Sequence, residues 1–243
     1  MKSRLLLNSR GGGHLQNKLL QGFTLSEVLI TLGIIGIVAA MTLPSLIGNY
    51  RAKQLSTGLK TAYSLIAQAI DKMEADGIDT TPEAFSSVSQ SFANKLKNYF
   101  EVLYDCGSSF ASMNTKYCAI NDGSYTNFSR KSPMGFGVLD DGQFVLKNGM
   151  LLMFENMRGS SNIYITVDVN GRNRTPNAWG WDVFTFQLVD RSGKGILLPM
   201  GAEGTNITDV NRYCNSKTSD GASGIACTAK ALSEKDYFRN LFE

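Results

Sequence analysis

An apolar run near the N-terminus places the strongest limit on what this chain can fold into. Residues 23–47 are 25 residues with a single charged side chain, Glu27. As an α-helix the run would be roughly 37 Å long, because a helix rises ~1.5 Å per residue. The hydrocarbon core of a bilayer is about 30 Å thick, so the helix can cross it with some tilt. The sequence therefore predicts a membrane-spanning helix.

The residues before this run indicate its orientation. Residues 1–22 contain four basic residues and no acid. Basic residues tend to stay on the cytoplasmic side, so we expect a single-pass protein with a cytoplasmic N-terminus and an extracytoplasmic head. A secretory signal peptide is the first alternative, but its apolar centre has only about 7–15 residues and precedes the small-residue cleavage site. Here the run is longer, and the small-residue site lies before it.

Glu27 argues against the second alternative, a plain membrane anchor. A carboxylate inside the bilayer costs about 2–3 kcal/mol if it lies deep, so such a residue is usually paired or functional. A plain anchor would leave Glu27 unexplained.

The sequence Gly22-Phe23-Thr24-Leu25-Ser26-Glu27, followed by the unbroken apolar run, resembles the processing motif of type IV prepilins and type II secretion pseudopilins. Pro44 also matches a proline common in pilin helices. Two positions depart from the usual pattern: Gln21, where the family often has Lys or Arg, and Ser26, where an apolar residue is frequent. The resemblance is strong over residues 1 to about 75 and loose beyond them.

The resemblance implies how the N-terminus is processed. In that family a prepilin peptidase cuts after the glycine, here Gly22, and methylates the new terminal amine, here that of Phe23. The Phe23 amine can then pair with the carboxylate of Glu27 on a neighbouring subunit, which makes Glu27 an assembly residue. Residues 1–22 would be the leader peptide and residues 23–47 the transmembrane and filament-core helix. The partners implied are the peptidase, other pilin or pseudopilin subunits, the assembly platform and the membrane.

Three residues inside the apolar run affect the helix itself. Gly33, Gly36 and Pro44 weaken local helix hydrogen bonding and permit close approach or kinks. We expect them to give the helix flexibility; the alternative is that they are ordinary small residues of a membrane helix.

Residues 48–243 are expected to form an amphipathic helix and an extracytoplasmic head. Apolar residues recur at three and four positions up to Met73, so the helix should run from about 24 to 75 and pack its second half on the head. A second helix is predicted to start at Thr81-Pro82-Glu83. Its apolar stripe should be in the core: Phe85, Val88, Phe92, Leu96 and Tyr99.

From about residue 135 the pattern changes to that of strands. Residues 143–146 and 150–154 flank Asn148-Gly149, a strong hairpin signal. Side chains alternate in the period-two pattern of a strand along residues 163–169, and residues 183–188 and 196–198 are predicted to form a further hairpin. Residues 201–228 are predicted to be loop, and residues 229–243 a short terminal helix. The sequence thus predicts an α+β fold, in which a long N-terminal helix packs on an antiparallel β-sheet head, as the pilin resemblance also implies.

The four cysteines are Cys106, Cys118, Cys214 and Cys227. No Cys-x-x-Cys occurs, so neither a zinc ribbon nor a thioredoxin-like centre is suggested. An even number in an exported head favours disulfides. Three pairings are possible, and we expect the sequence-local one, in which Cys106 pairs with Cys118 and Cys214 with Cys227.

The segment from Asp168 to Asp182 has two interpretations. Asp168-Val169-Asn170-Gly171 resembles the start of a calcium loop, with Asp168, Asn170 and Asp182 as candidate ligands. The acid expected at the twelfth position of such a loop is replaced by Trp179, however, and turn chemistry alone explains Asp, Asn, Gly and Pro here. We favour a structural turn, keep calcium as the alternative, and expect no other cofactor.

Composition excludes several classes of function. Without the four basic residues of the leader, 20 Lys and Arg face 21 acids, a formal charge of −1, which gives no support to nucleic-acid binding. The only histidine is His14, so a chain that starts at Phe23 has none, which disfavours Ser-His-Asp and Cys-His catalysis. No phosphate-loop motif and no carboxylate pair of the glycosidase kind is evident. We expect no enzyme activity.

Two functions follow from the sequence. The first is a structural subunit of a type IV pilus-like or type II secretion pseudopilus filament, which would be stored in the inner membrane and would form a cell-surface or periplasmic filament. A DNA-uptake filament is equally compatible. The second is a membrane-tethered extracytoplasmic module that binds calcium, or sugar through Trp179 and Trp181, and does not polymerise.

Overall fold

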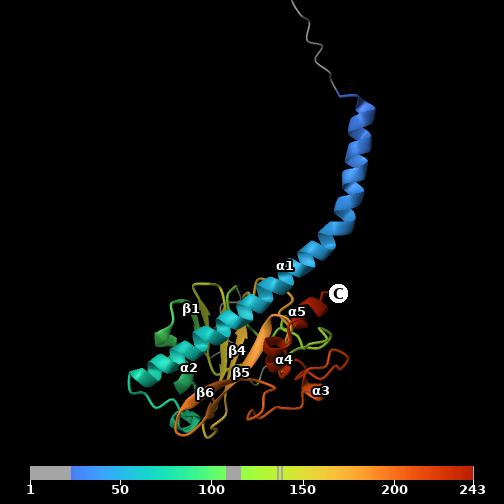
Figure 1. The fold of residues 1–243 in the computed structure, drawn as a ribbon. Coiled ribbons are helices and arrows are strands. Elements are labelled where there is room, and N and C mark those ends of the chain that lie inside the picture. The colour runs from blue at the N-terminus through green and yellow to red at the C-terminus, as the bar shows by residue number, and fades with distance from the viewer. Residues whose placement is uncertain (1–22, 108–115, 136, 138, 243) are drawn as a thin grey trace, which may run out of the picture. The chain divides into compact units, whose positions relative to one another are not determined.

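The computed structural model describes residues 23–107, 116–135, 137 and 139–242. The chain forms two compact units, Met1–Ser45 and Leu46–Glu243. Figure 1 shows the order of the elements along the chain. The long N-terminal helix predicted for residues 24–75 is confirmed as α1, which runs for 51 residues from Leu25 to Ala75.

The second unit contains a six-stranded antiparallel sheet whose strands follow in chain order, β1 to β6. The predicted meander and α+β class are therefore confirmed. The strands are β1 (Val102–Gly107), β2 (Gln143–Leu146), β3 (Leu151–Glu155), β4 (Ile163–Asp168), β5 (Val183–Asp190) and β6 (Gly195–Pro199). Strand β1 was not predicted. Its pairing with β2 is interrupted by two register shifts, which is typical of a bulged edge strand.

The hairpin turns lie where the sequence predicted them. In the β2–β3 turn the Gly149 amide donates to the carbonyl oxygen of Leu146 at 2.9 Å, and Gly149 has a φ of +91°. In the β5–β6 turn the Gly193 amide donates to the Asp190 side chain at 2.8 Å. Both turns need a positive φ, which glycine adopts at little cost.

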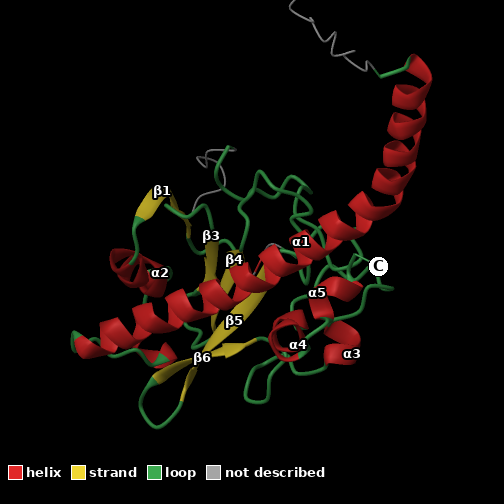
Figure 2. Ribbon diagram, turned by 45° about the horizontal axis from the view of Figure 1, so that its top comes forward, coloured by secondary structure: helices red, strands yellow, loops and turns green. Residues whose placement is uncertain are grey.

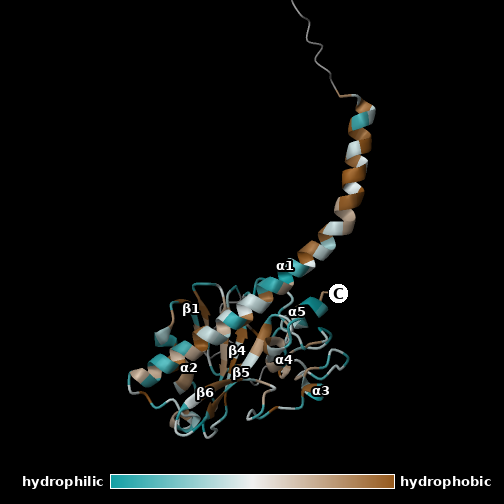
Figure 3. Ribbon diagram, viewed as in Figure 1, coloured by the Kyte–Doolittle hydropathy of each residue, from teal (hydrophilic) through white to brown (hydrophobic). Residues whose placement is uncertain are grey.

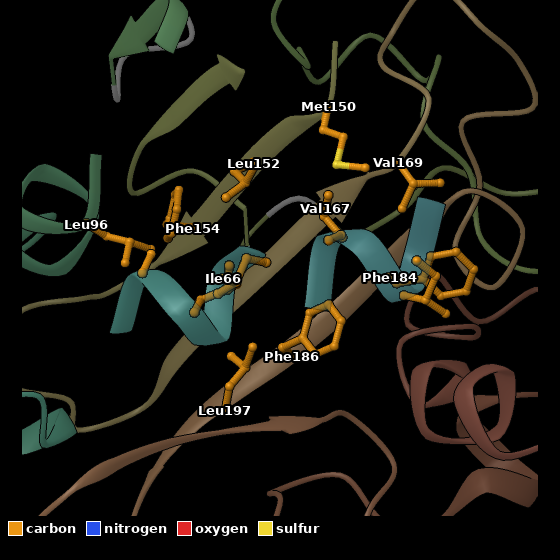
Figure 4. Close-up of a cluster of buried hydrophobic side chains, with 14 of the residues drawn as sticks. Ile66, Leu96, Met150, Leu152, Phe154, Val167, Val169, Phe184, Phe186 and Leu197 are labelled. Atoms are coloured by element: carbon orange, nitrogen blue, oxygen red, sulfur yellow. The ribbon is translucent and has the colours of Figure 1, made fainter. Parts of the chain in front are cut away.

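One face of the sheet packs against the second half of α1 (Figure 2). The helix buries a stripe at helical spacing: Ala52, Leu55, Leu59, Ala62, Ile66, Ala69, Ile70 and Met73. Figure 4 shows Ile66 among side chains of the sheet that include Leu152, Val167 and Phe186. This contact was predicted from the amphipathic pattern.

The other face of the sheet is also buried, which the sequence did not predict. Val145, Leu151 and Met153 alternate with the residues that face α1, and they pack under loop residues such as Tyr125 and Trp179. Strands β2 to β4 are therefore buried along almost their whole length.

The prediction of a single helix that starts near Thr81 is wrong. The segment is broken into a 3₁₀ turn, η1 (Pro82–Phe85), a short helix, α2 (Ser91–Leu96), and a second 3₁₀ turn, η2 (Lys97–Tyr99). Gln90 has a φ of +66°, which ends any helix that would reach it. The Oδ1 atom of Asn156 accepts from the Phe92 amide at 3.0 Å and so satisfies the start of α2 from a distant part of the chain.

This break changes two expected core positions. Val88 lies between η1 and α2 and is 59% exposed, and Tyr99 is only partly buried. Phe85, Phe92 and Leu96 are buried as predicted. Thr81 makes no side-chain cap bond; instead its amide and hydroxyl donate to Asp79 Oδ1 at 2.9 and 2.7 Å.

The prediction of loop over residues 201–228 is wrong in part, because this segment contains a short helix, α3 (Val210–Tyr213). Within the described residues, the single helix predicted for 229–243 is replaced by two, α4 (Cys227–Ser233) and α5 (Tyr237–Asn240). Tyr237 anchors α5 on the head, since its hydroxyl donates to the carbonyl oxygen of Gly180 at 2.7 Å.

Candidate functional site

The first half of α1 presents apolar side chains without a cover. No residue of its most apolar 18-residue window is buried, and by length and composition α1 can cross a membrane. Figure 3 shows this half as mostly hydrophobic, whereas hydrophobic and hydrophilic residues alternate along the second half. Large apolar side chains that are at least half exposed include Leu29, Ile30, Leu32, Ile34, Ile35, Ile37 and Val38. Such a surface needs lipid or another apolar surface around it.

Glu27 lies at the start of α1 and forms a capping box with Thr24. The Thr24 amide and hydroxyl both donate to Glu27 Oε2 at 2.8 Å, and the Glu27 amide donates to Thr24 Oγ1 at 3.2 Å. The pair fits the Thr-x-x-Glu pattern of a helix start, so the role of Thr24 was readable from the sequence but was missed. Within the described residues, Glu27 Oε1 accepts no hydrogen bond and is available to a donor from another molecule.

The other predicted residues of this segment have little around them. Phe23 is 89% exposed, and the predicted cleavage residue Gly22 lies outside the described residues. A Cβ added to Gly33 or Gly36 would meet nothing within 4 Å. Pro44 lies inside α1. At the two glycines the helix backbone is therefore accessible, and closely packed membrane helices contact one another at such positions.

Both disulfides have the sequence-local pairing. Cys106 is bonded to Cys118, and Cys214 to Cys227. The first joins edge strand β1 to a loop, and the second joins the end of α3 to the start of α4. Each closes a loop of similar length, which stabilises the folded chain by about 3 kcal/mol in the chain-entropy view.

Asp168 and Asp182 lie together in a buried turn. Asp168 Oδ1 accepts from the amides of Asn170 and Gly171 at 3.2 and 2.8 Å, and its Oδ2 accepts from the Tyr125 hydroxyl at 2.7 Å. Asp182 Oδ1 accepts from the Ala178 amide at 2.7 Å. Each carboxylate thus fixes the backbone of the loop that follows or precedes its strand.

The third predicted ligand, Asn170, bridges the two acids. Its side-chain amide donates to Asp182 Oδ2 at 3.3 Å, and the Asn177 amide donates to the same oxygen at 3.0 Å. The structure therefore brings Asp168, Asn170 and Asp182 together. Tyr125, which completes the cluster, was missed because it lies far away in the sequence.

Burial changes the proton affinity of both acids. Burial and the negative charge of Asp182 raise the pKa of Asp168 to about 8, and burial raises the pKa of Asp182 to about 6. Two carboxylates this close cannot both ionise without cost, so the pair retains a proton to higher pH than exposed acids do.

The hydrogen bonds of the cluster favour a structural turn, and one observation keeps calcium open. All four carboxylate oxygens already accept hydrogen bonds, and the described residues contain no group of three or more His, Cys, Asp or Glu side chains suited to a metal ion. However, the buried atoms Asn170 Oδ1 and Asn177 Oδ1 have no donor among the described residues. Calcium at Asp168, Asn170 and Asp182 stays a prediction.

The two tryptophans differ in role. Trp179 is buried, and its indole N–H donates to Thr185 Oγ1 at 3.1 Å, so it anchors the loop on β5. Trp181 is half-buried, and its indole N–H donates to the Phe128 carbonyl at 3.1 Å. The Arg130 guanidinium lies 4.4 Å from the centre of the Trp181 ring.

Comparison with known proteins agrees with the N-terminal geometry. Residues 20–43 match the family described as the prokaryotic N-terminal methylation motif. The match supports a type IV prepilin or pseudopilin-type chain that prepilin peptidase processes, with a membrane anchor and an extracellular head. No curated protein and no solved structure matches the chain.

Proposed function

We propose that the chain is a non-enzymatic structural subunit of a type IV pilus-like or type II secretion pseudopilus filament. Prepilin peptidase would cut between Gly22 and Phe23 and methylate the Phe23 amine. The observation that carries the proposal is the position of Glu27: a carboxylate at the start of an uncovered apolar helix, within a match to the methylation motif.

An apolar helix of this kind can leave the bilayer only if another apolar surface replaces the lipid. A bundle of identical or similar helices provides that surface, and the bare backbone at Gly33 and Gly36 permits close approach. The head remains outside the membrane, and the inner membrane would store the subunit before assembly.

Glu27 can serve both its own helix and a neighbour. Its Oε2 atom accepts the two hydrogen bonds from Thr24, which leaves Oε1 for the methylated Phe23 amine of an adjacent subunit. Pairing a carboxylate with an ammonium offsets the cost of placing either among packed helices, and removing one partner leaves the other charge unpaired.

Two substitutions separate the helix-capping role of Glu27 from its charge. Glu27→Gln keeps an acceptor for Thr24, because Gln also completes a capping box, but it removes the charge. Glu27→Ala removes both. We expect both variants to be processed and inserted but to form no filaments, measured in sheared fractions and by cysteine crosslinking between α1 helices.

Thr24→Ala is the matched control, because it removes the two hydrogen bonds of the Thr24 hydroxyl and keeps the Glu27 charge. It should reduce filament yield only modestly. If Glu27→Gln assembles like the wild type, charge pairing is not the assembly interaction.

The second candidate is a membrane-tethered module that binds calcium or sugar without polymerising. The two unpartnered buried oxygens of Asn170 and Asn177 favour it. For this candidate, Glu27→Ala should be harmless or should improve insertion, because a carboxylate in the span costs about 2–3 kcal/mol. The wild type should then form no oligomers beside its assembly machinery.

A further inference from the structure

A cavity of about 410 Å³ opens on the head between α1 and the loop that follows β4. Its wall includes Arg51 from α1, Asn173 and Arg174 from the loop, Arg130, Trp181 and Phe242, which follows α5. Residues far apart in the sequence therefore bring three guanidinium groups to one cavity, and no Asp or Glu is found among the described residues that line it.

These three arginines are not neutralised by the fold. Within the described residues, no carboxylate lies within 4.0 Å of Arg51, Arg130 or Arg174. The neighbouring Arg172, in contrast, pairs with Asp122 at 3.1 Å. Unpaired guanidinium groups around one cavity are suited to an anion with several oxygens, because each presents a planar fork of donors.

The wall of the cavity is partly fixed before any ligand binds. Trp181 is held by its hydrogen bond to Phe128, and the Phe242 ring meets the Trp181 ring edge-on with centroids 5.8 Å apart. The Arg130 guanidinium lies over the Trp181 ring, 4.4 Å from the ring centroid. An arginine held against a tryptophan loses less side-chain freedom when it binds an anion.

The same end of the head carries exposed apolar residues. Leu46, Ile47 and Tyr50 directly precede Arg51 in α1 and are 64%, 49% and 69% exposed. An apolar run that ends in a tyrosine and an arginine is typical of the boundary between hydrocarbon and lipid headgroups. Phosphate is the anion present at that boundary.

We propose that the cavity bounded by Arg51, Arg130, Arg174 and Trp181 binds the phosphate of an anionic phospholipid headgroup. The inference rests on membrane anchoring and not on filament assembly. It assigns the head a contact with the membrane surface, which would hold the anchored chain in a defined orientation.

The chain contains two tryptophans, which makes the cavity directly observable. Trp179 is 1% exposed, whereas Trp181 lines the cavity, so binding should change the fluorescence of Trp181. The full mature chain in a nonionic detergent is titrated with short-chain phosphatidylglycerol, with short-chain phosphatidylcholine and with inorganic phosphate. We expect saturable binding of phosphatidylglycerol at least tenfold tighter than that of the other two, and loss of the signal in Trp181→Phe.

Charge-matched variants test which residues bind. The combined variant Arg51→Gln, Arg130→Gln and Arg174→Gln should weaken phosphatidylglycerol binding at least tenfold. The control, Lys72→Gln, Lys95→Gln and Arg191→Gln, removes three exposed positive charges elsewhere on the head and should change binding less than twofold. All six side chains are exposed, so circular dichroism and thermal unfolding should show both proteins folded.

Two kinds of result would contradict the proposal in whole or in part. If inorganic phosphate binds as tightly as phosphatidylglycerol and depends on the three arginines, the phosphate site stands and the lipid source is overturned. If phosphatidylcholine binds as tightly as phosphatidylglycerol, or if the two triple variants bind alike, the proposal is overturned.

Discussion

Asp168 takes part both in a local turn and in a contact between distant parts of the chain. Its side chain caps the turn at Asn170 and Gly171, and it also accepts a hydrogen bond from Tyr125 on a distant loop. The same burial that makes these bonds effective raises the pKa of Asp168 to about 8, well above the usual value of about 3.9. Its protonation is therefore coupled to folding.

The sign of this coupling predicts a loss of stability with rising pH. The folded chain holds a proton on Asp168 that the unfolded chain releases above about pH 4. The contribution of this proton to the free energy of unfolding is therefore complete below about pH 4 and is lost as pH rises through about 8. We expect Asp168→Asn to flatten the fall in the midpoint of thermal unfolding between pH 5 and 8.5. One pKa unit corresponds to about 1.4 kcal/mol, so the effect is measurable.

Asp71→Asn is the control, because it removes an exposed carboxyl group on α1 that lies outside the buried cluster. The same scans with calcium and with a chelator test the alternative site. We expect no difference between them. A calcium-dependent gain at pH 8 that Asp168→Asn abolishes would instead establish Asp168 as a calcium ligand.

Gly171 and Gly193 form a matched pair for a steric test. Both have a φ near +80°. A Cβ on Gly171 would lie 2.3 Å from the carbonyl oxygen of Gly149, whereas one on Gly193 would meet nothing within 4 Å. Gly193→Ala should cost only the strain of a positive φ, about 1–2 kcal/mol.

We therefore expect Gly171→Ala to reduce the free energy of unfolding by at least 2 kcal/mol more than Gly193→Ala, because two turns must move apart. Chemical denaturation of both variants measures the difference. Equal losses would mean that the β2–β3 turn and the loop after β4 do not approach each other closely.

At the scale of elements, α1 shows how one helix serves two environments. Its first half is uncovered and its second half buries a stripe on the sheet. The period of three and four residues in the second half predicted this contact, since such a stripe must be covered in a stable fold.

The contribution of this packing can be measured at Ile66, which is 1% exposed. Ile66→Ala should destabilise the protein by about 2–5 kcal/mol, because it leaves a cavity between α1 and the sheet. Val88→Ala removes an apolar side chain that is 59% exposed and should cost no more than about 0.5 kcal/mol. Similar losses for the two variants in denaturant titrations would contradict the packing of α1 on the sheet.

For the whole molecule, the proposed processing would set the residue at which the mature chain begins. The motif predicts a mature protein that begins at Phe23 and carries one extra methyl group on its amine. Intact-mass measurement of the protein extracted from membranes tests both features at once. Gly22→Leu is the control variant, and it should retain residues 1–22 because the peptidase needs the glycine. Wild-type protein that keeps its first 22 residues would refute the proposed processing.

The sequence by itself determined the features that depend on neighbouring residues. The apolar run, the Thr24–Glu27 capping pair and the Asn148-Gly149 turn are all local, since hydrogen bonds within a helix or a tight turn connect residues a few positions apart. The amphipathic stripe of α1 is also local, because its period is set by the geometry of the helix.

Tertiary structure alone decided where distant residues meet. The break between η1 and α2 depends on Asn156, which directly follows β3 and caps α2. The second buried face depends on loops that cover Val145 and Leu151. Likewise, no sequence pattern places Arg51, Arg130 and Arg174 around one cavity. Contacts of this kind form only once the sheet and α1 are packed, because the chain that joins the residues carries no periodic signal of their proximity.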